Sequence, residues 1–436
     1  MAKLSSPLLE FTTVIKEKGL VANKDLSPSN IIVKRFVRLA KKVPDTRLSG
    51  MISYPLEEIL LIAFFAVLSG AEKFTQMSEF GKLREKWFRK FLAYENGTPS
   101  HDTFKRVFSL IDPKSLQSVT VDFLMKNMEG IKKALKVEPT GPRLINIDGK
   151  QARGTGRSKS KNGAIPNLQT LNVYDASLGI CIAMNSINVK SNEIPAAQEI
   201  LPSLDLKGAI VTCDALNTQK KTMGIIAGKE KKGDYVAALK GNHHDFYDDV
   251  DAFFTKNTMA GIAEKKVNFF STTEKAHSQI EQRNYYLTTD IKWFGDREKW
   301  EKLRSFICNE KIITDVHTGE IKTEKRFFIA SIKDVTLCAE AIRGHWAVEN
   351  RLHWHLDYSF CDDDDTNTDK NAYLNFTSFR RMALALCKMA QPFMKTSIKT
   401  MRWIIGMEPT DVLGTILGTL DENHLENALR EVNEKK

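Results

Sequence analysis

The sequence lacks the signatures of several common classes of protein. No two of its six cysteines stand in CxxC spacing, so a zinc ribbon and a dithiol redox motif are unsupported. It has no GxxxxGKS/T phosphate-binding loop, and no GxGxxG motif follows a strand-like segment. The longest apolar run, residues 59–68, is much shorter than the roughly 20 residues that cross a membrane. The first 20 residues lack the apolar stretch of a signal peptide, and together these absences predict a cytoplasmic protein.

The sequence also lacks a balance of charge. Lys and Arg number 64 against 54 Asp and Glu, which gives a net charge of +10. An excess of cations suits a polyanionic partner, because cationic side chains displace condensed counterions from nucleic acid. Charge alone leaves open a basic soluble protein without such a partner. A hydrophobic content of 42% permits a large buried core.

Hydrophobic patterning divides the chain into three parts. Residues 1–138 are mostly periodic at helical spacing and predict an α-helical N-terminal domain, which we expect to associate with DNA. Residues 139–400 predict an α/β catalytic domain, interrupted at about 251–332 by a mostly extended, β-rich insertion. Residues 401–436 predict a C-terminal helical tail, and its highly charged end is expected to fray.

The central part has the element order of a ribonuclease-H-like core. Its candidate strands are residues 144–147, 171–174, 180–187, 209–213 and 235–239. Candidate helices follow the third and fourth strands, and a further helix over 337–358 follows the insertion. The sequence therefore predicts an α/β fold with a ribonuclease-H-like core, in which the insertion precedes the last catalytic helix.

Two aspartates follow apolar strand candidates in this core. Asp148 follows Ile147, and Asp214 follows Cys213. Catalytic groups of α/β proteins collect where strands end, which favours a site at these two positions. Each aspartate alone is more often a turn residue, and Asp148-Gly149 is a common turn dipeptide.

A third carboxylate lies on the helix predicted after the insertion. Glu349 shares a helical face with His345, Leu352 and His353. A carboxylate on a partly apolar face needs a partner or a metal, although a His–Glu pair along the helix would also explain it.

Three carboxylates on separate elements suit two Mg²⁺ ions, which prefer oxygen ligands. Such ions, about 3.5–4 Å apart, stabilise the attacking and leaving oxygens of a displacement at phosphorus. A zinc site built from His243, His244, His345, His353 and His355 is a weaker alternative, because adjacent histidines in a strand point to opposite faces.

Basic and aromatic residues surround these acids. Lys150 and Arg153 lie in a glycine-rich stretch that would allow close approach to phosphate. Trp346 and Trp354 are expected to pack in the core rather than to stack on bases. The run of aspartates at 362–365 is expected to be a solvated acidic loop.

Several motifs in sequence order resemble one family, the H-repeat-associated DDE transposases of bacterial insertion sequences. They are YPLEEIL at 54–60, SEFG at 78–81, PSHDTF at 99–104, IDGK at 147–150, KSNEI at 190–194, LKGAIVT at 206–212, LKGN at 239–242, HW at 345–346, EN at 349–350 and LHW at 352–354. The resemblance implies that Asp148, Asp214 and Glu349 ligate Mg²⁺, for which Mn²⁺ would substitute. It also implies cleavage and joining of double-stranded DNA at terminal inverted repeats, by a homodimer on paired ends in the nucleoid. The expected DNA contacts are Lys150, Arg153, Lys240, Asn242, Arg283, His345 and Arg351.

The chain departs from the family pattern near Glu349. An arginine commonly stands four positions before the glutamate, where this chain has His345, and a lysine seven positions after it, where this chain has Leu356. After Asp363 the family is usually basic, whereas Asp364 and Asp365 follow here. These departures and the net charge of +10 keep open a catalytically inactive DNA-binding remnant. A related nuclease that cuts DNA without joining it is a further alternative.

Overall fold

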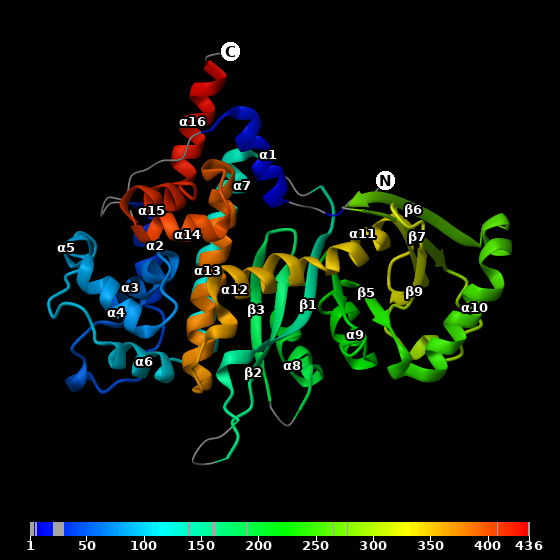
Figure 1. Cartoon of the computed structure of the whole chain (residues 1–436), viewed down its shortest axis with the longest axis horizontal. Helices are drawn as coiled ribbons and strands as arrows, with labels where there is room; N and C mark the ends of the chain where they lie inside the picture. The colour runs from blue at the N-terminus through cyan, green and yellow to red at the C-terminus, as the bar shows by residue number, and fades with distance from the viewer. Residues whose placement is uncertain are drawn as a thin grey trace.

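A computed structural model describes most of the chain. The described residues are 4, 7–20, 30–137, 140–158, 163–188, 191–264, 266–276, 278–407 and 409–434. The predicted domain boundary at 138–139 lies outside them. The described residues form a mixed α/β protein with a helical N-terminal region and a large mixed sheet (Figure 1). Each helix among them is too short or too polar to span a lipid bilayer.

The sheet combines the predicted core strands with the strands of the insertion. Its strands are β1 (Arg143–Ala152), β2 (Leu168–Asp175), β3 (Ile180–Ile187), β4 (Ala209–Cys213), β5 (Asp234–Leu239), β6 (Val267–Ala276), β7 (Gln279–Thr288), β8 (Ser305–Asp315) and β9 (Ile321–Ala330). Their spatial order is β3-β2-β1-β4-β5-β9-β8-β7-β6. β4 lies parallel to both β1 and β5, and the other pairings are antiparallel. The insertion thus extends the core sheet through β9.

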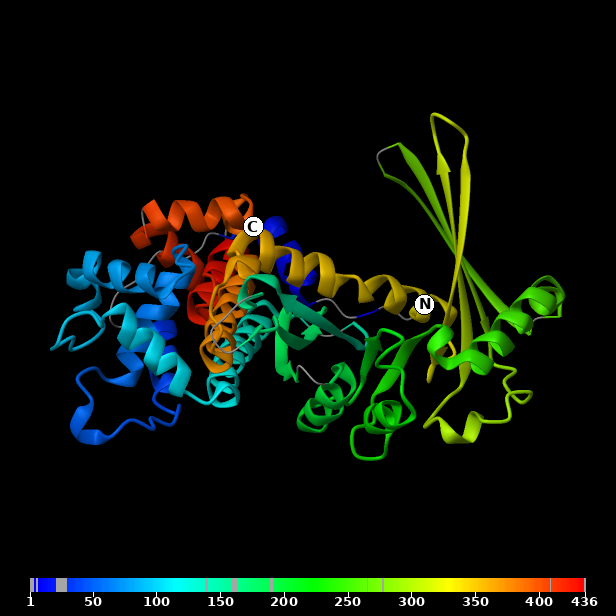
Figure 2. The same cartoon turned by 60° about the horizontal axis from the view of Figure 1, so that its bottom comes forward.

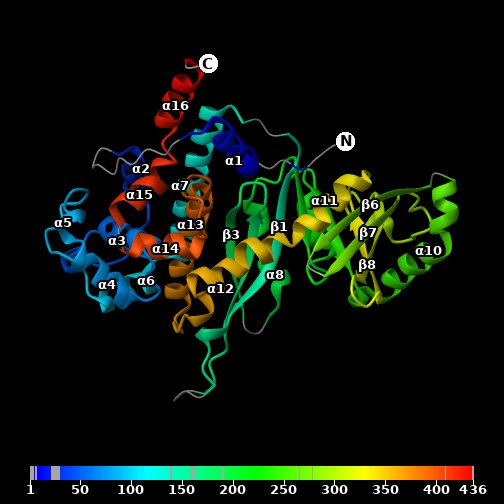
Figure 3. The ribbon, with the colours of Figure 1, turned by 45° about the horizontal axis from the view of Figure 1, so that its top comes forward.

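Helices cover both faces of the core strands. Side chains alternate between the two faces along each strand, so the apolar residues of β1 contact different helices on each face. Ile145 and Ile147 of β1 share a buried cluster with residues of α8 (Glu193–Ile200) and α9 (Lys220–Ala227). On the other face lie α11 (Val335–His345) and α12 (Trp354–Phe360), and Asn146 bonds to the end of α11. Figures 1 and 3 show α11 and α12 crossing the strands toward the helical region.

The helical region is built from both ends of the chain. Its helices are α1 (Pro7–Lys18), α2 (Ile31–Ala40), α3 (Leu56–Leu68), α4 (Phe74–Leu83), α5 (Glu85–Phe88), α6 (His101–Leu110), α7 (Pro113–Leu135), α13 (Lys370–Met394), α14 (Ile398–Met407), α15 (Pro409–Gly418) and α16 (Glu422–Glu434). α13 packs against α6 and α7, and α16 packs against α7. Leu425 near the start of α16 is fully buried, and the expectation that the charged end frays stays a prediction.

The insertion differs from its prediction in two respects. Residues 251–263 were expected to be extended but belong to α10 (His244–Ala263), and β6 was not predicted. The outer parts of the two hairpins, β6–β7 and β8–β9, project from the body of the molecule (Figure 2). Residues 321–326 of β9 are exposed without interruption, so both faces of this part of the ribbon are exposed.

Candidate active site

Asp148 and Asp214 lie at the same edge of the parallel strand pair. The register between β1 and β4 ends with Ile147 opposite Cys213, so the two aspartates come next on neighbouring strands. β1 was predicted to end at Asp148, but it continues to Ala152 by pairing with β2. Asp148 therefore lies within a strand, and the alternative in which Asp148-Gly149 forms a turn is wrong.

Glu349 reaches this edge from a wide helical turn. The predicted single helix over 337–358 is interrupted, and Glu349–His353 form a π-helical turn between α11 and α12. One oxygen of Glu349, one oxygen of Asp148 and one ring nitrogen of His353 all lie within 4.8 Å of one another. Glu349 is exposed, not buried as its predicted face implied, because the wide turn changes which residues share a face.

The charges around Asp148 favour its protonated form. Burial, followed by the nearby carboxylates of Glu193, Asp214 and Glu349, raises the pKa of Asp148 from 3.8 to about 7. A carboxylate that is buried among other carboxylates is stabilised by a proton or by a cation. This edge of the sheet is therefore a place where a divalent metal ion would relieve repulsion.

Glu193, at the first position of α8, is a site residue that the sequence did not reveal. Asn217 Nδ2 donates to Glu193 Oε2 at 3.0 Å and to Asp214 Oδ1 at 3.1 Å, which holds the two carboxylates together. A Cβ atom at Gly149 would lie 1.9 Å from Glu193 Oε1. Glycine after Asp148 therefore makes room for Glu193. Asn192-Glu193 lies in a recognised motif, but nothing in its spacing connects it to Asp148.

His353 lies beside Asp148. Asn172 Oδ1 accepts hydrogen bonds from Arg381 Nε at 3.1 Å and Nη2 at 2.6 Å, which leaves Asn172 Nδ2 to donate to His353 Nε2 at 3.1 Å. The proton of the neutral ring is then on Nδ1, which lies 3.6 Å from Asp148 Oδ2. Burial, with Lys150 and Arg381 nearby, lowers the pKa of His353 to about 3. In this tautomer the Nδ1 proton faces Asp148, so Nδ1 presents no lone pair to a metal ion.

His345 fixes the end of α11 to the sheet. Asn146 Nδ2 donates to the carbonyls of Gly344 at 2.6 Å and His345 at 3.0 Å. His345 Nδ1 lies 2.9 Å from Thr212 Oγ1, which itself donates to Asn146 Oδ1. Burial lowers the pKa of His345 to about 4. The ring is neutral at pH 7, so the structure does not support His345 as a cationic DNA contact.

Lys150 is a structural residue and not a surface cation. Its side chain is 5% exposed, and its Nζ lies 2.5 Å from Asp357 and 3.8 Å from Asp362. Asp362 is fully buried and pairs with Arg380 at 2.8 Å, as does Asp365. The expectation of a solvated loop is wrong for Asp362 and Asp365, because they neutralise Lys150 and Arg380 in the interior.

The other expected DNA contacts occupy different environments. Arg153 is 79% exposed, and Lys240 is exposed after β5. Asn242 is also exposed, and its Nδ2 donates to the carbonyl of Ala215 at 2.8 Å. Arg283 is only 16% exposed and pairs with two glutamates, so its charge is neutralised within the insertion. The glycine-rich stretch was expected to approach phosphate, but Gly154 packs against the backbone of Asp363. A Cβ atom at Gly154 would lie 2.3 Å from the Asp363 carbonyl oxygen.

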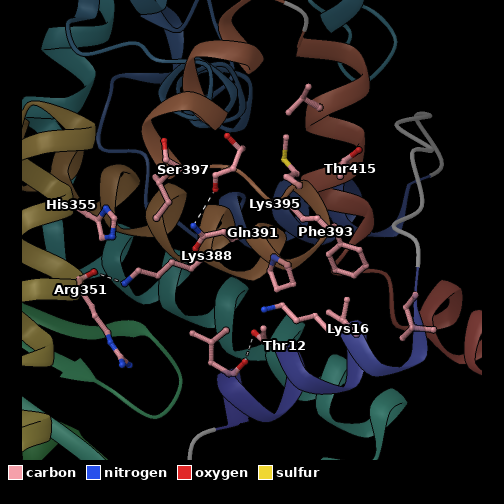
Figure 4. Close-up of a pocket in the computed structure, with 18 of the residues that line it drawn as sticks. Thr12, Lys16, Arg351, His355, Lys388, Gln391, Phe393, Lys395, Ser397 and Thr415 are labelled. Carbon is pink, nitrogen blue, oxygen red and sulfur yellow. Dashed lines mark hydrogen bonds between the residues drawn. The ribbon is translucent and has the colours of Figure 1, made fainter. Parts of the chain in front are cut away.

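Arg351 lies at a cavity of 1470 Å³ between α1, α13 and α15. Figure 4 shows Lys16, Lys388 and Lys395 at the same cavity. Lys388 Nζ donates to the backbone carbonyl of Arg351 and to Tyr174 Oη. Burial, followed by the charge of Arg351, lowers the pKa of Lys388 to about 7.

Trp346 and Trp354 are exposed, contrary to prediction. They are 49% and 51% exposed, respectively. The guanidinium of Arg326 lies 5.5 Å from the Trp346 ring centroid, and Trp354 stacks on Tyr358. Both tryptophans flank Glu349, so the surface beside the acidic residues is aromatic as well as polar.

The donor set at the sheet edge suits a hard divalent cation. The carboxylates of Asp148, Asp214, Glu349 and Glu193 carry oxygen atoms of the kind that Mg²⁺ prefers as ligands. The fully buried Oδ1 of Asn217 lacks a hydrogen-bond partner among the described residues. In the described part of the chain, the one group of three or more potential ligand residues within mutual reach is Asp148, Glu349 and His353, and this group does not include Asp214 or Glu193. Of the histidines of the zinc alternative, only His353 belongs to this group.

Comparisons with known proteins identify the family of the chain. Residues 139–378 match the family described as the transposase DDE domain, and residues 38–124 match a DDE_Tnp_1-associated family. The chain belongs to the DDE transposase family. This transposase homologue is 30% identical to YncI of Escherichia coli O157:H7, provisionally named a transposase, over 79% of this chain and 85% of that one. It is 30% identical to YhhI of Escherichia coli (strain K12), provisionally named an H repeat-associated transposase, over 81% of this chain and 90% of that one.

A solved structure, the piggyBac transposase synaptic complex with hairpin DNA, has a TM-score of 0.36 and 11% identity to the transposase homologue. It covers 100% of this chain and 85% of that one. This likeness is too weak to support an argument about the fold or the site.

Proposed function

We propose that the protein is a transposase that cleaves and joins DNA at the terminal inverted repeats of an insertion sequence. The observation that supports this proposal best is the crowding of Asp148 by Glu193, Asp214 and Glu349, which raises the pKa of Asp148 to about 7. Such repulsion costs stability unless a cation enters. The strand order β3-β2-β1-β4-β5, with helices on both faces, supports a ribonuclease-H-like assignment for this part of the sheet.

Asp148, Asp214 and Glu349 are the proposed Mg²⁺ ligands, and Mn²⁺ would substitute. Bound divalent ions would supply stabilisation of the attacking and leaving oxygens at the phosphodiester. Glu193 is a proposed fourth carboxylate, held beside Asp214 by Asn217.

The surrounding residues hold this set in place. His353 presents its Nδ1–H toward Asp148, and Asn146 ties the end of α11 to β1. Because these positioning groups lie on strands and on a helix fixed to them, the acids are preorganised for the reaction. Double-stranded DNA is the proposed partner, with the exposed Arg153 and Lys240 among its contacts, and two copies are proposed to hold paired ends.

The test uses the full chain and DNA carrying the inverted repeats that flank its own gene. We expect end cleavage in Mg²⁺, with loss of cleavage but retained DNA binding in Asp148→Asn, Asp214→Asn and Glu349→Gln. The matched control is Asp249→Asn, an exposed aspartate of α10, which should cleave like wild type. Undiminished cleavage by Asp148→Asn would contradict the proposal.

The same assay separates the two alternatives. Binding to the repeats without cleavage in Mg²⁺ or Mn²⁺ would identify a DNA-binding remnant, which the departures near Glu349 motivate. Cleavage without joining of the cut end to a second DNA would identify a nuclease. Sedimentation of the complex with paired ends tests whether two copies assemble.

A further inference from the structure

The cavity between α1, α13 and α15 gathers positive charges. Its volume is 1470 Å³, and the cations in its lining are Lys16, Arg351, Lys388 and Lys395. The described residues that line it include no Asp or Glu. Like charges around one cavity repel each other, and an anion between them relieves that repulsion. The electrostatics of the cavity therefore favour a negatively charged ligand.

Lys388 presents an ammonium group at the wall of this cavity. Its Nζ donates to the backbone carbonyl of Arg351 and to Tyr174 Oη. An ammonium carries three N–H bonds, so one remains for a ligand after these two acceptors among the described residues. Burial, followed by the charge of Arg351, lowers the pKa of Lys388 to about 7. An anion bound beside Lys388 would favour its charged form.

Apolar side chains supply another part of the lining. Ile15 of α1, Pro392 of α13 and Ile398 of α14 are buried there, and Phe393 is partly exposed at the same cavity (Figure 4). Small-molecule sites are concave and mostly apolar, with a few placed polar groups, and they commonly enclose roughly 300–1000 Å³. An inorganic phosphate would occupy only a small part of this cavity. Its size and lining suit an organic molecule that carries several negative charges.

We propose that this cavity binds a small organic polyphosphate of nucleotide size. The phosphates would contact Lys16, Arg351, Lys388 and Lys395, and the organic part would pack against the apolar lining. A DNA duplex carries its phosphates on a convex outer surface, whereas a concave site of this kind suits a small molecule. The proposal does not depend on the proposed function, because none of the four carboxylates of the candidate active site lines the cavity.

Lys388 joins the cavity to the turn that begins with Glu349. The carbonyl that accepts its hydrogen bond belongs to Arg351, and Arg351 lies within the π-helical turn Glu349–His353. A phosphate that binds Lys388 and Arg351 would therefore contact this turn directly.

The test is a calorimetric titration of the full chain in a metal chelator, so that the carboxylates of the candidate active site hold no metal–nucleotide complex. The probes are ATP, tripolyphosphate, which keeps the phosphates alone, and adenosine, which keeps the organic part alone. We expect one ATP to bind per chain, more tightly than either part. Lys16→Gln and Lys395→Gln should each weaken ATP binding about ten-fold, whereas Lys16→Arg, which keeps the charge, should retain most of it. Lys18→Gln is the matched control, because Lys18 lies on the same helix but not at the cavity, and it should bind ATP like wild type.

A second measurement locates the ligand. Pyridoxal 5′-phosphate carries a phosphate and an aldehyde. A neutral lysine amine adds to the aldehyde with loss of water, and borohydride reduces the resulting imine to a stable secondary amine. Because the pKa of Lys388 is lowered to about 7, its amine is available as a nucleophile at pH 8. We expect peptide mass analysis to find Lys388 labelled ahead of exposed lysines such as Lys399, and ATP to protect Lys388 from labelling.

Several results would overturn the proposal. ATP could bind without saturation, or Lys18→Gln could weaken binding as much as Lys16→Gln, and either result would leave only general attraction to a basic protein. Displacement of ATP by a DNA duplex would assign the cavity to the DNA backbone. Tripolyphosphate that binds as tightly as ATP would exclude the apolar lining from the site. Equal thermal midpoints of Lys16→Gln and Lys18→Gln exclude misfolding as the cause of a difference.

Discussion

Replacing Asp148 with asparagine should stabilise the metal-free protein above neutral pH. In the folded protein, burial and the carboxylates of Glu193, Asp214 and Glu349 raise the pKa of Asp148 to about 7, against 3.8 in the unfolded chain. Asparagine keeps the shape and removes the charge, so the variant isolates the cost of this one ionisation.

The sign and the size of the effect follow from these two values. Below pH 3.8 the carboxyl is protonated in both states, and it adds no pH dependence. Between pH 3.8 and about 7 the unfolded chain ionises first, so stability falls as pH rises, and the loss is complete above about 7. The two pKa values differ by about 3, which corresponds to at most about 4 kcal/mol of folding free energy.

The assay is denaturant unfolding of wild type and Asp148→Asn in a metal chelator at pH 5 and pH 8. We expect the variant to gain stability relative to wild type at pH 8 and to gain much less at pH 5. Adding Mg²⁺ at pH 8 should stabilise wild type, because the cation relieves the same repulsion, and should stabilise the variant less. Asp249→Asn is the exposed control and should change neither profile. An Asp148→Asn variant that is less stable than wild type at pH 8, or equally affected at both pH values, would refute the reasoning.

The remaining predictions concern the neighbours of Asp148. Glu193→Gln should lower the pKa of Asp148 by removing a nearby charge, so the metal-free loss of stability between pH 5 and 8 should shrink; an unchanged pH profile would contradict the placement of Glu193. The same variant should bind Mn²⁺ more weakly in a paramagnetic resonance titration. Lys150→Met should destabilise the protein by about 3 kcal/mol, because it leaves Asp357 without its cation and removes one of the cations near the buried Asp362, which keeps its pairing with Arg380. Arg153→Ala should change stability by less than about 0.5 kcal/mol and weaken DNA binding; a larger loss of DNA binding in Lys150→Met than in Arg153→Ala would support Lys150 as a DNA contact.

The core strands and two of the acids could be predicted from local patterns. Strands such as 209–213 are nearly continuous apolar runs, and Asp214 follows directly. The position of Asp214 after its own strand was therefore enough to predict it as a site residue. The predicted end of β1 at Asp148 was wrong because β1 pairs with two neighbouring strands. Its parallel pairing with β4 ends at Ile147, but its antiparallel pairing with β2 continues to Ala152. The sequence of one strand does not show that the strand pairs with a second neighbour, so the longer strand could not be predicted.

Interactions between distant segments account for most of the other differences. Asp362 and Asp365 were predicted to be solvated because they lie in a run of aspartates. Both are buried, because Asp362 pairs with Arg380 and Lys150 and Asp365 pairs with Arg380 in the interior. Glu193 is placed at Asp148 by the absence of a side chain at Gly149. Both effects depend on pairs of residues far apart in sequence, which periodicity cannot detect.

The environment of Glu349 differs for a local reason. Regular helical spacing places Glu349 on a partly buried face with His345 and His353. The π turn at 349–353 changes that spacing, so Glu349 is exposed, while His353 stays buried beside Asp148. A wide turn has no reliable sequence signature.

The most direct test of the account is a crystal structure of the protein soaked in Mn²⁺, with the metal located by its anomalous scattering. We predict a peak within about 2.0–2.3 Å of carboxylate oxygens of Asp148 and of Asp214 or Glu349, and its disappearance in Asp148→Asn. A peak elsewhere, such as at Asp362–Asp365, with none at Asp148, would contradict the claim that these acids form a metal centre.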